Sequence, residues 1–172
     1  MSFDGDDYLA TTLPASIQTP NITMAAWVKI SSIGPGAQTV IAGEPRQANA
    51  VGKGVHVAVS STGVPFINKG SNTGGWIGVA GTTTMATGTW YYLVGTVDAS
   101  AVRMYVNGVL EGTLSNALAI DWTDGAGGNY PDPAQLYVGA FKDNSIGSGA
   151  VIPNISFLSA VLDDVQVYNR AL

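Results

Sequence analysis

The chain has 172 residues, of which 46% are hydrophobic, and this length suits one domain with a single core rather than two. Seven basic residues against twelve acidic ones give a net charge of −5, so the cationic surface that grips phosphate groups is lacking and we expect no nucleic-acid partner. The absence of cysteine excludes disulfides, thiol nucleophiles and thiolate metal sites.

Alternation of apolar and polar residues with period two recurs along the chain and predicts β-strands, whereas helical periodicity is nearly absent. In the segment 54–60, three valines share one face and His56 lies on the other. The segment 90–97 is bulky on both faces, which predicts a strand covered on both sides. The predicted strands are 24–30, 39–42, 54–60, 64–68, 77–81, 90–97, 102–106, 109–114, 136–141 and 161–168.

The turns between these strands are short, and one of them has a specific signal. Asn107-Gly108 joins two apolar runs, and both residues tolerate the positive φ of a type I′ hairpin turn. Strands about ten residues apart predict an all-β antiparallel sandwich, or jelly roll, with 1–172 as one domain. The longest stretches without a predicted strand are 121–133 and 145–156.

Five segments carry motifs that belong together. They are SFDGDDYL at 2–9, ITMAAWVK at 22–29, GTWYYLVGT at 88–96, MYVNGV at 104–109 and LDDVQVYNRAL at 162–172. In this order they resemble the laminin-G-like domains of the concanavalin A-like lectin/glucanase superfamily. The resemblance implies a two-sheet jelly roll whose first and last strands lie close together, which agrees with the strand pattern.

The same resemblance implies a structural calcium ion, since related jelly rolls often hold one between the two ends of the chain. It suggests Asp4 and Asp163 as ligands, because hard carboxylate oxygens suit Ca²⁺. The alternative is a solvated acidic start and a buried aspartate bonded to backbone. No cofactor other than this ion is expected.

The residues that catalysis would need are missing. Glycoside hydrolysis requires two carboxylates flanking the bond, but the only glutamates, Glu44 and Glu111, lie in unrelated segments. The adjacent Asp163 and Asp164 are expected to point to opposite faces of their strand. His56 is the only histidine and no G-x-S-x-G motif occurs, so a nucleophilic triad and a catalytic zinc site lack their parts. We expect no catalytic residues and no enzymatic activity.

Tryptophans divide into two groups. Trp27 and Trp90 lie in predicted strands and are interpreted as packing residues. Aromatic and polar side chains in or beside loops form the candidate contact set for a glycan or a partner: Trp76, Trp122, Asp124, Asn129, Tyr130 and Asp132. The alternative is that these aromatics hold their own loops or meet a neighbouring subunit.

Only 11% of the residues are charged, against about 25% in an average domain. This is explained either by a neutral polar coat or by a surface covered by other subunits. No apolar run approaches the roughly 20 residues that cross a bilayer, and the start of the chain lacks the features of a secretory signal. We therefore expect no membrane partner.

The leading hypothesis is a non-catalytic structural protein, most plausibly a capsid decoration or surface protein of a virion, packed on capsid subunits or on copies of itself. The alternative is a carbohydrate-binding module for a cell-surface or extracellular polysaccharide, acting outside the cell as part of a secreted protein.

Overall fold

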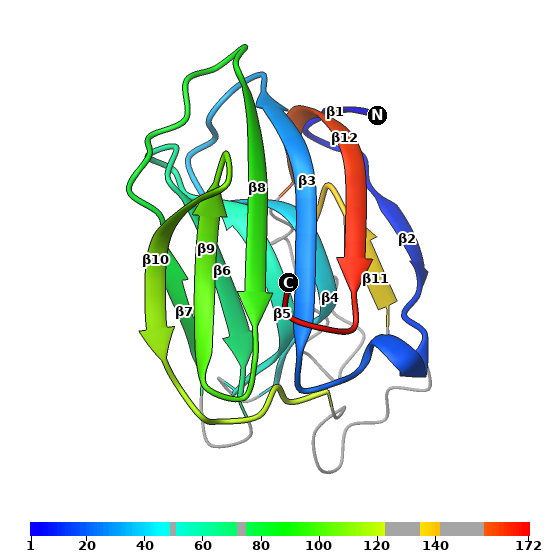
Figure 1. Cartoon of the computed structure of the whole chain (residues 1–172). Coiled ribbons are helices and arrows are strands. Elements are labelled where there is room, and N and C mark those ends of the chain that lie inside the picture. The colour runs from blue at the N-terminus through cyan, green and yellow to red at the C-terminus, as the bar shows by residue number, and fades with distance from the viewer. Residues whose placement is uncertain (49–50, 72–74, 123–134, 142–156) are drawn as a thin grey trace.

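The computed structural model describes residues 1–48, 51–71, 75–122, 135–141 and 157–172, and these form two stacked antiparallel sheets (Figure 1). Sheet A has the order β1-β12-β3-β8-β9-β10, and sheet B has the order β2-β11-β4-β5-β6-β7. The strands of sheet A are β1 (Ser2–Asp4), β12 (Ser159–Tyr168), β3 (Ile22–Ile30), β8 (Trp90–Val97), β9 (Ala101–Val106) and β10 (Val109–Ser115). The strands of sheet B are β2 (Leu9–Thr12), β11 (Gln135–Val138), β4 (Gln38–Ala48), β5 (Val51–Val59), β6 (Pro65–Gly70) and β7 (Trp76–Ala80).

The core lies between the two sheets and follows directly from the period of two. In β3, every second side chain from Ile22 to Ile30 is fully buried against sheet B, and in β5 Val55, Val57 and Val59 face back. The sheets approach closely at Gly95 of β8. A Cβ atom there would lie 2.6 Å from Ile67 Cδ1, so only glycine fits between the layers.

A tight turn and a bulge affect the outer face of sheet A. Asn107 and Gly108 have φ of 51° and 81°, which confirms the tight turn predicted between β9 and β10. In β12 the pairing with β3 shifts between Asp163 and Gln166, and Asp164 has a φ of 45°. Such a bulge changes the direction in which the side chains of a strand point.

The predicted all-β fold is confirmed, and every predicted strand is present, with ends that differ by a few residues. The first and last strands pair directly, with Phe3 opposite Ala160. The predicted ranges lack β1 and β2. A first strand beside the last was expected only from the resemblance, and the four residues of β2 are all exposed and carry no alternating pattern. Within the described ranges the only helix is the three-residue 3-10 turn η1 (Ala15–Ile17), so no helix there has the length to span a bilayer.

One prediction about β8 is wrong. The bulky residues on both faces suggested a strand covered on both sides, but only the face with Leu93 and Val97 is buried in the core. The opposite face, with Trp90 and Tyr92, lies at the surface of the molecule. Bulky side chains therefore marked an exposed aromatic surface in this strand.

Candidate functional site

The outer face of sheet A carries two large aromatic side chains that are open to solvent. Trp27 of β3 is 38% exposed and Trp90 of β8 is 39% exposed. Both had been interpreted as packing residues, and this interpretation is wrong because the inward positions of their strands belong to the residues on either side, such as Val28 and Tyr91. Exposed tryptophans that share one sheet face are a common basis of ligand contact.

The strand register arranges four residues in one row across the sheet. Asp163 pairs with Trp27, and Trp27 pairs with Tyr92. The Tyr92 N–H donates to Asn107 Oδ1 at 2.8 Å, and the Asn107 N–H donates to the Tyr92 carbonyl at 2.8 Å. The row therefore runs perpendicular to the strands, from a carboxylate on β12 to an amide at the end of β9.

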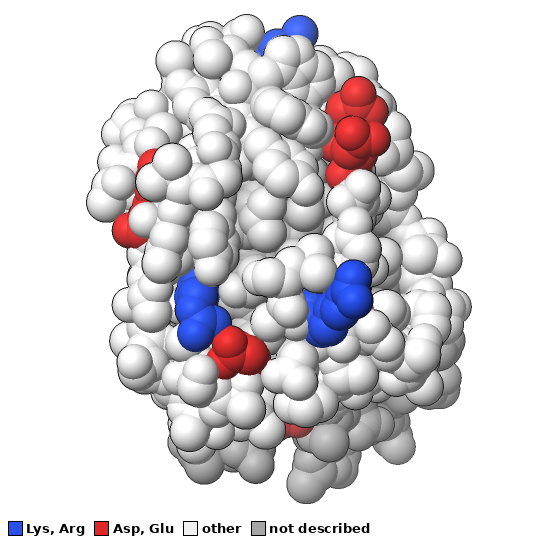
Figure 2. Space-filling view, in the orientation of Figure 1, with Lys and Arg blue, Asp and Glu red and all other residues white. Residues whose placement is uncertain are grey.

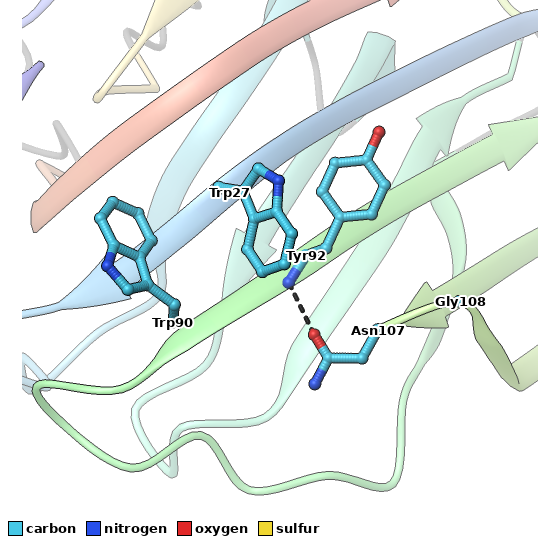
Figure 3. A pocket seen from close by; sticks show the side chains of 5 residues that line it. All are labelled: Trp27, Trp90, Tyr92, Asn107 and Gly108. Atoms are coloured by element: carbon cyan, nitrogen blue, oxygen red, sulfur yellow. Dashed lines mark hydrogen bonds between the residues drawn. The ribbon is translucent and has the colours of Figure 1, made fainter.

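The aromatic middle of this row is held by ring contacts. The Trp27 and Tyr92 rings have centroids 5.2 Å apart with planes inclined by 39°, and Figure 3 shows Trp27 between Trp90 and Tyr92. Lys29 Nζ lies 5.1 Å from the centre of the Trp90 ring, a cation–π contact that fixes this indole from one side. Each of the three rings therefore contacts another side chain of the outer face of sheet A.

The acidic end of the row contains two carboxylates instead of one. Asp163 and Asp164 were expected on opposite faces of β12, which holds only for a regular strand. The bulge and the positive φ of Asp164 bring both exposed side chains to the same hollow. Burial raises the pKa of the Tyr92 hydroxyl, and the nearby Tyr168 and Asp164 raise the pKa further, so Tyr92 remains a protonated donor at neutral pH.

Two adjoining hollows flank the tryptophans, and both are open to solvent. One, of about 340 Å³, is lined by Trp27, Trp90, Asp163 and Asp164. The other, of about 480 Å³, is lined by Trp27, Trp90, Tyr92, Asn107 and Gly108 (Figure 3). We call their union the aromatic groove. The face that holds it is largely uncharged, with a few small groups of acidic and basic side chains (Figure 2).

The tryptophans predicted as ligand contacts lie elsewhere. Trp76 is half-buried on the outer side of sheet B, where its ring meets His56 edge-on with centroids 4.6 Å apart. Trp122 packs against the core, and its Nε1–H donates to the Thr19 carbonyl at 2.9 Å. Neither residue contributes to the aromatic groove. The remaining predicted contacts fall outside the described residues: Asp124, Asn129, Tyr130 and Asp132.

The predicted calcium ligands are not brought together. Asp4 pairs with Ser159, whereas Asp163 lies four residues further along β12, which corresponds to about 13 Å. Asp4 instead forms an exposed cluster with Asp6 and Asp7, whose carboxylate oxygens lie within 4.8 Å of one another. Three carboxylates fall short of the six to eight oxygen ligands that Ca²⁺ usually takes. A structural calcium ion remains a prediction.

The fold that carries the aromatic groove is similar to that of known proteins. The family model described as the concanavalin A-like lectin/glucanases superfamily matches residues 3–172. No curated protein sequence matches the chain. The Limulus polyphemus SAP-like pentraxin is similar in structure, with a TM-score of 0.64, 19% identity and coverage of 99% of this chain and 76% of the pentraxin chain.

Two further solved structures are similar. The Ruminococcus gnavus IT-sialidase CBM40 module bound to α2,3-sialyllactose has a TM-score of 0.66, with 13% identity and coverage of 100% of this chain and 90% of the module. Domains LG4-5 of the mouse laminin α1 chain have a TM-score of 0.55, with 18% identity and coverage of 99% of this chain and 43% of theirs. At these identities the likeness establishes the fold alone.

Proposed function

Because the chain belongs to the concanavalin A-like lectin/glucanase superfamily, we propose that it is a non-catalytic carbohydrate-binding protein whose ligand lies in the aromatic groove. The observation that carries the proposal is the exposed pair of tryptophans beside the two carboxylates of β12. This is the combination that a sugar ring requires. Its C–H face packs on an aromatic ring, and its hydroxyls donate to charged acceptors.

The polar groups of the groove match hydroxyl groups on both sides. Asp163 Oδ1 accepts the Asp164 N–H at 3.0 Å, which orients one carboxylate and leaves the second carboxylate facing the hollow. At the other end, the Asn107 oxygen is used by the Tyr92 N–H, so its amide nitrogen is the group that can donate to a ligand. A few placed polar groups around an apolar floor are typical of small-molecule sites.

The arrangement also supports binding without hydrolysis. Glycosidases place two carboxyl groups on opposite sides of the scissile bond, at about 5 to 9.5 Å from each other. The two carboxylates of the aromatic groove are consecutive residues on β12, and the side formed by β8 and β9 offers Tyr92 and Asn107 instead. The Ruminococcus gnavus module supports the idea that this fold can hold a sugar.

The test is a glycan array followed by titration calorimetry on the hits. We expect weak binding, at micromolar to millimolar dissociation constants, because the groove is open and shallow. Trp27→Ala should weaken binding at least about tenfold, which corresponds to about 1.4 kcal/mol. Tyr8→Ala is the matched control, because Tyr8 is also an exposed aromatic residue but lies outside the aromatic groove. Binding that Trp27→Ala leaves unchanged would refute the assignment.

A capsid decoration role on a virion is a second proposal. Its support is the outer edge of sheet A, where Val109, Leu110 and Leu114 of β10 are 62%, 49% and 38% exposed. An edge strand with exposed apolar side chains is suited to pairing with another subunit. Sedimentation of the purified protein tests this role: self-association or attachment to a capsid particle supports it, and a monomer that attaches to no particle contradicts it.

A further inference from the structure

We propose that the aromatic groove takes two consecutive sugar units of an uncharged glycan, laid across the strands of sheet A. The inference rests on the proposed function and adds the length and the charge of the ligand. The inference starts from the row formed by Asp163, Trp27, Tyr92 and Asn107, which crosses the four neighbouring strands β12, β3, β8 and β9. Three strand spacings correspond to about 14 Å, a span that exceeds one sugar ring and accommodates two linked rings.

The two hollows supply one position for each ring. Both hollows include Trp27 and Trp90 in their lining, so the indoles form a shared floor and wall. Each hollow, at about 340 and 480 Å³, is at the lower end of the volumes of ligand sites. A single ring would leave one hollow and its polar groups unused.

Different polar groups close the two ends. The end at β12 presents the Asp163 and Asp164 carboxylates, and the end at β9 presents the amide of Asn107. Lys29, a basic residue beside the groove, has its ammonium group over the Trp90 ring. An acidic sugar would meet two carboxylates in the groove, so like-charge repulsion selects for neutral hydroxyl-bearing rings.

A length series measures this directly by calorimetry or tryptophan fluorescence. The probes are glucose with maltose and maltotriose, glucose with cellobiose and cellotriose, and lactose with 3′-sialyllactose. We expect the better disaccharide to bind at least tenfold more tightly than glucose, its trisaccharide to gain less than twofold over it, and sialyllactose to bind no more tightly than lactose.

Two variants probe the separate ends. Asp164→Asn removes one charge from the first hollow, and Asn107→Asp keeps the oxygen that accepts the Tyr92 N–H while removing the amide donor from the second. Each should weaken disaccharide binding several-fold, with Tyr8→Ala as the unaffected control. Asp164→Asn should also narrow the difference between lactose and sialyllactose, which a purely structural role would not do.

The outcomes separate this inference from the function beneath it. If glucose and the disaccharides bind with equal affinity, and Trp27→Ala abolishes the binding of both, the proposal of two sugar units is overturned while the proposal of carbohydrate binding stands. A trisaccharide that gains tenfold over its disaccharide, or sialyllactose that binds more tightly than lactose, would overturn the stated length or charge. No binding by any of these sugars would overturn both proposals.

Discussion

His56 couples the stability of the fold to pH. It is the only histidine of the chain, its side chain is 7% exposed on the outer side of sheet B, and its ring packs edge-on against Phe66, Trp76 and Phe141. Its Nδ1 atom has no hydrogen-bond partner among the residues that the structure describes, and its Nε2 lies 3.4 Å from the amide nitrogen of Asn68. Burial lowers the pKa of this imidazole from 6.5 to about 3, because the charged form is poorly solvated there.

The direction of the effect follows from which state binds the proton. Well above pH 6.5 the imidazole is neutral in both the folded and the unfolded chain, so the protonation of His56 does not reduce the free energy of unfolding. Between pH 6.5 and about 3 the unfolded chain takes up a proton that the folded chain refuses, so stability falls as the pH falls. At about 1.4 kcal/mol for each pH unit, the free energy of unfolding at pH 5 should be about 2 kcal/mol lower than at pH 8.

Urea unfolding followed by tryptophan fluorescence at pH 8, 7, 6 and 5 measures this decline. His56→Gln and His56→Leu cannot titrate, so the free energy of unfolding should stay level over the same range, whatever its absolute value. The lowered pKa values of Asp98 and Glu111 affect stability only below the ordinary values of 3.8 and 4.5, outside this window. Equal declines in the wild type and both variants would refute the reasoning, as would an imidazole NMR signal that titrates near pH 6.5.

Two further changes test the packing between layers and loops. Gly95→Ala should destabilise the fold by about 1–3 kcal/mol in urea unfolding, because the added methyl group overpacks a close approach of the two sheets. Gly36→Ala, whose Cβ would meet no atom of the described residues within 4 Å, is the control and should have little effect. Glu111→Gln should cost about 1–2 kcal/mol, because its carboxylate accepts the N–H groups of Thr82 and Thr83 and the Thr83 hydroxyl at 2.6–2.9 Å. The pKa of Glu111 is lowered by these bonds, so the stability that they contribute declines as the pH falls below the ordinary value of 4.5. A loss in Glu111→Gln that is the same at pH 7 and at pH 3 would contradict the charge-assisted bonds.

Most of the strands could be predicted from the sequence because their apolar and polar residues alternate, and the Asn107-Gly108 turn because its two residues tolerate positive φ. Strand β2 has no such alternation and was missed. The exposed face of β8 could not be predicted, since Trp90 and Tyr92 are as bulky as Tyr91 and Leu93, which face the core. Hydrophobic size alone does not distinguish a buried face of a strand from an exposed aromatic face. The pairing of a tryptophan with a tyrosine on adjacent strands emerges only once the register of β3 and β8 is known.

The carboxylate pair shows a second limit of sequence reasoning. Strict alternation would place the Asp163 and Asp164 side chains on opposite faces of β12. The surrounding residues give no signal for the bulge that brings the two side chains to the same hollow. Trp122 shows the reverse error, because its position near a loop suggested exposure, while its indole nitrogen is bonded to the chain beside η1. The positions of the Asp164 and Trp122 side chains depend on how segments that are distant in the sequence pair and pack, and local sequence patterns do not contain this information.

The row that crosses β12, β3, β8 and β9 joins segments that lie far apart along the chain. A ligand bound along this row would stabilise the folded chain, because unfolding of any one of the four strands removes part of its binding site. At one hundred times its dissociation constant, such a molecule would add about 2.7 kcal/mol to the free energy of unfolding. The Tm should therefore rise when a ligand occupies the groove, and a thermal-shift screen of soluble sugars can search for the ligand before its identity is known.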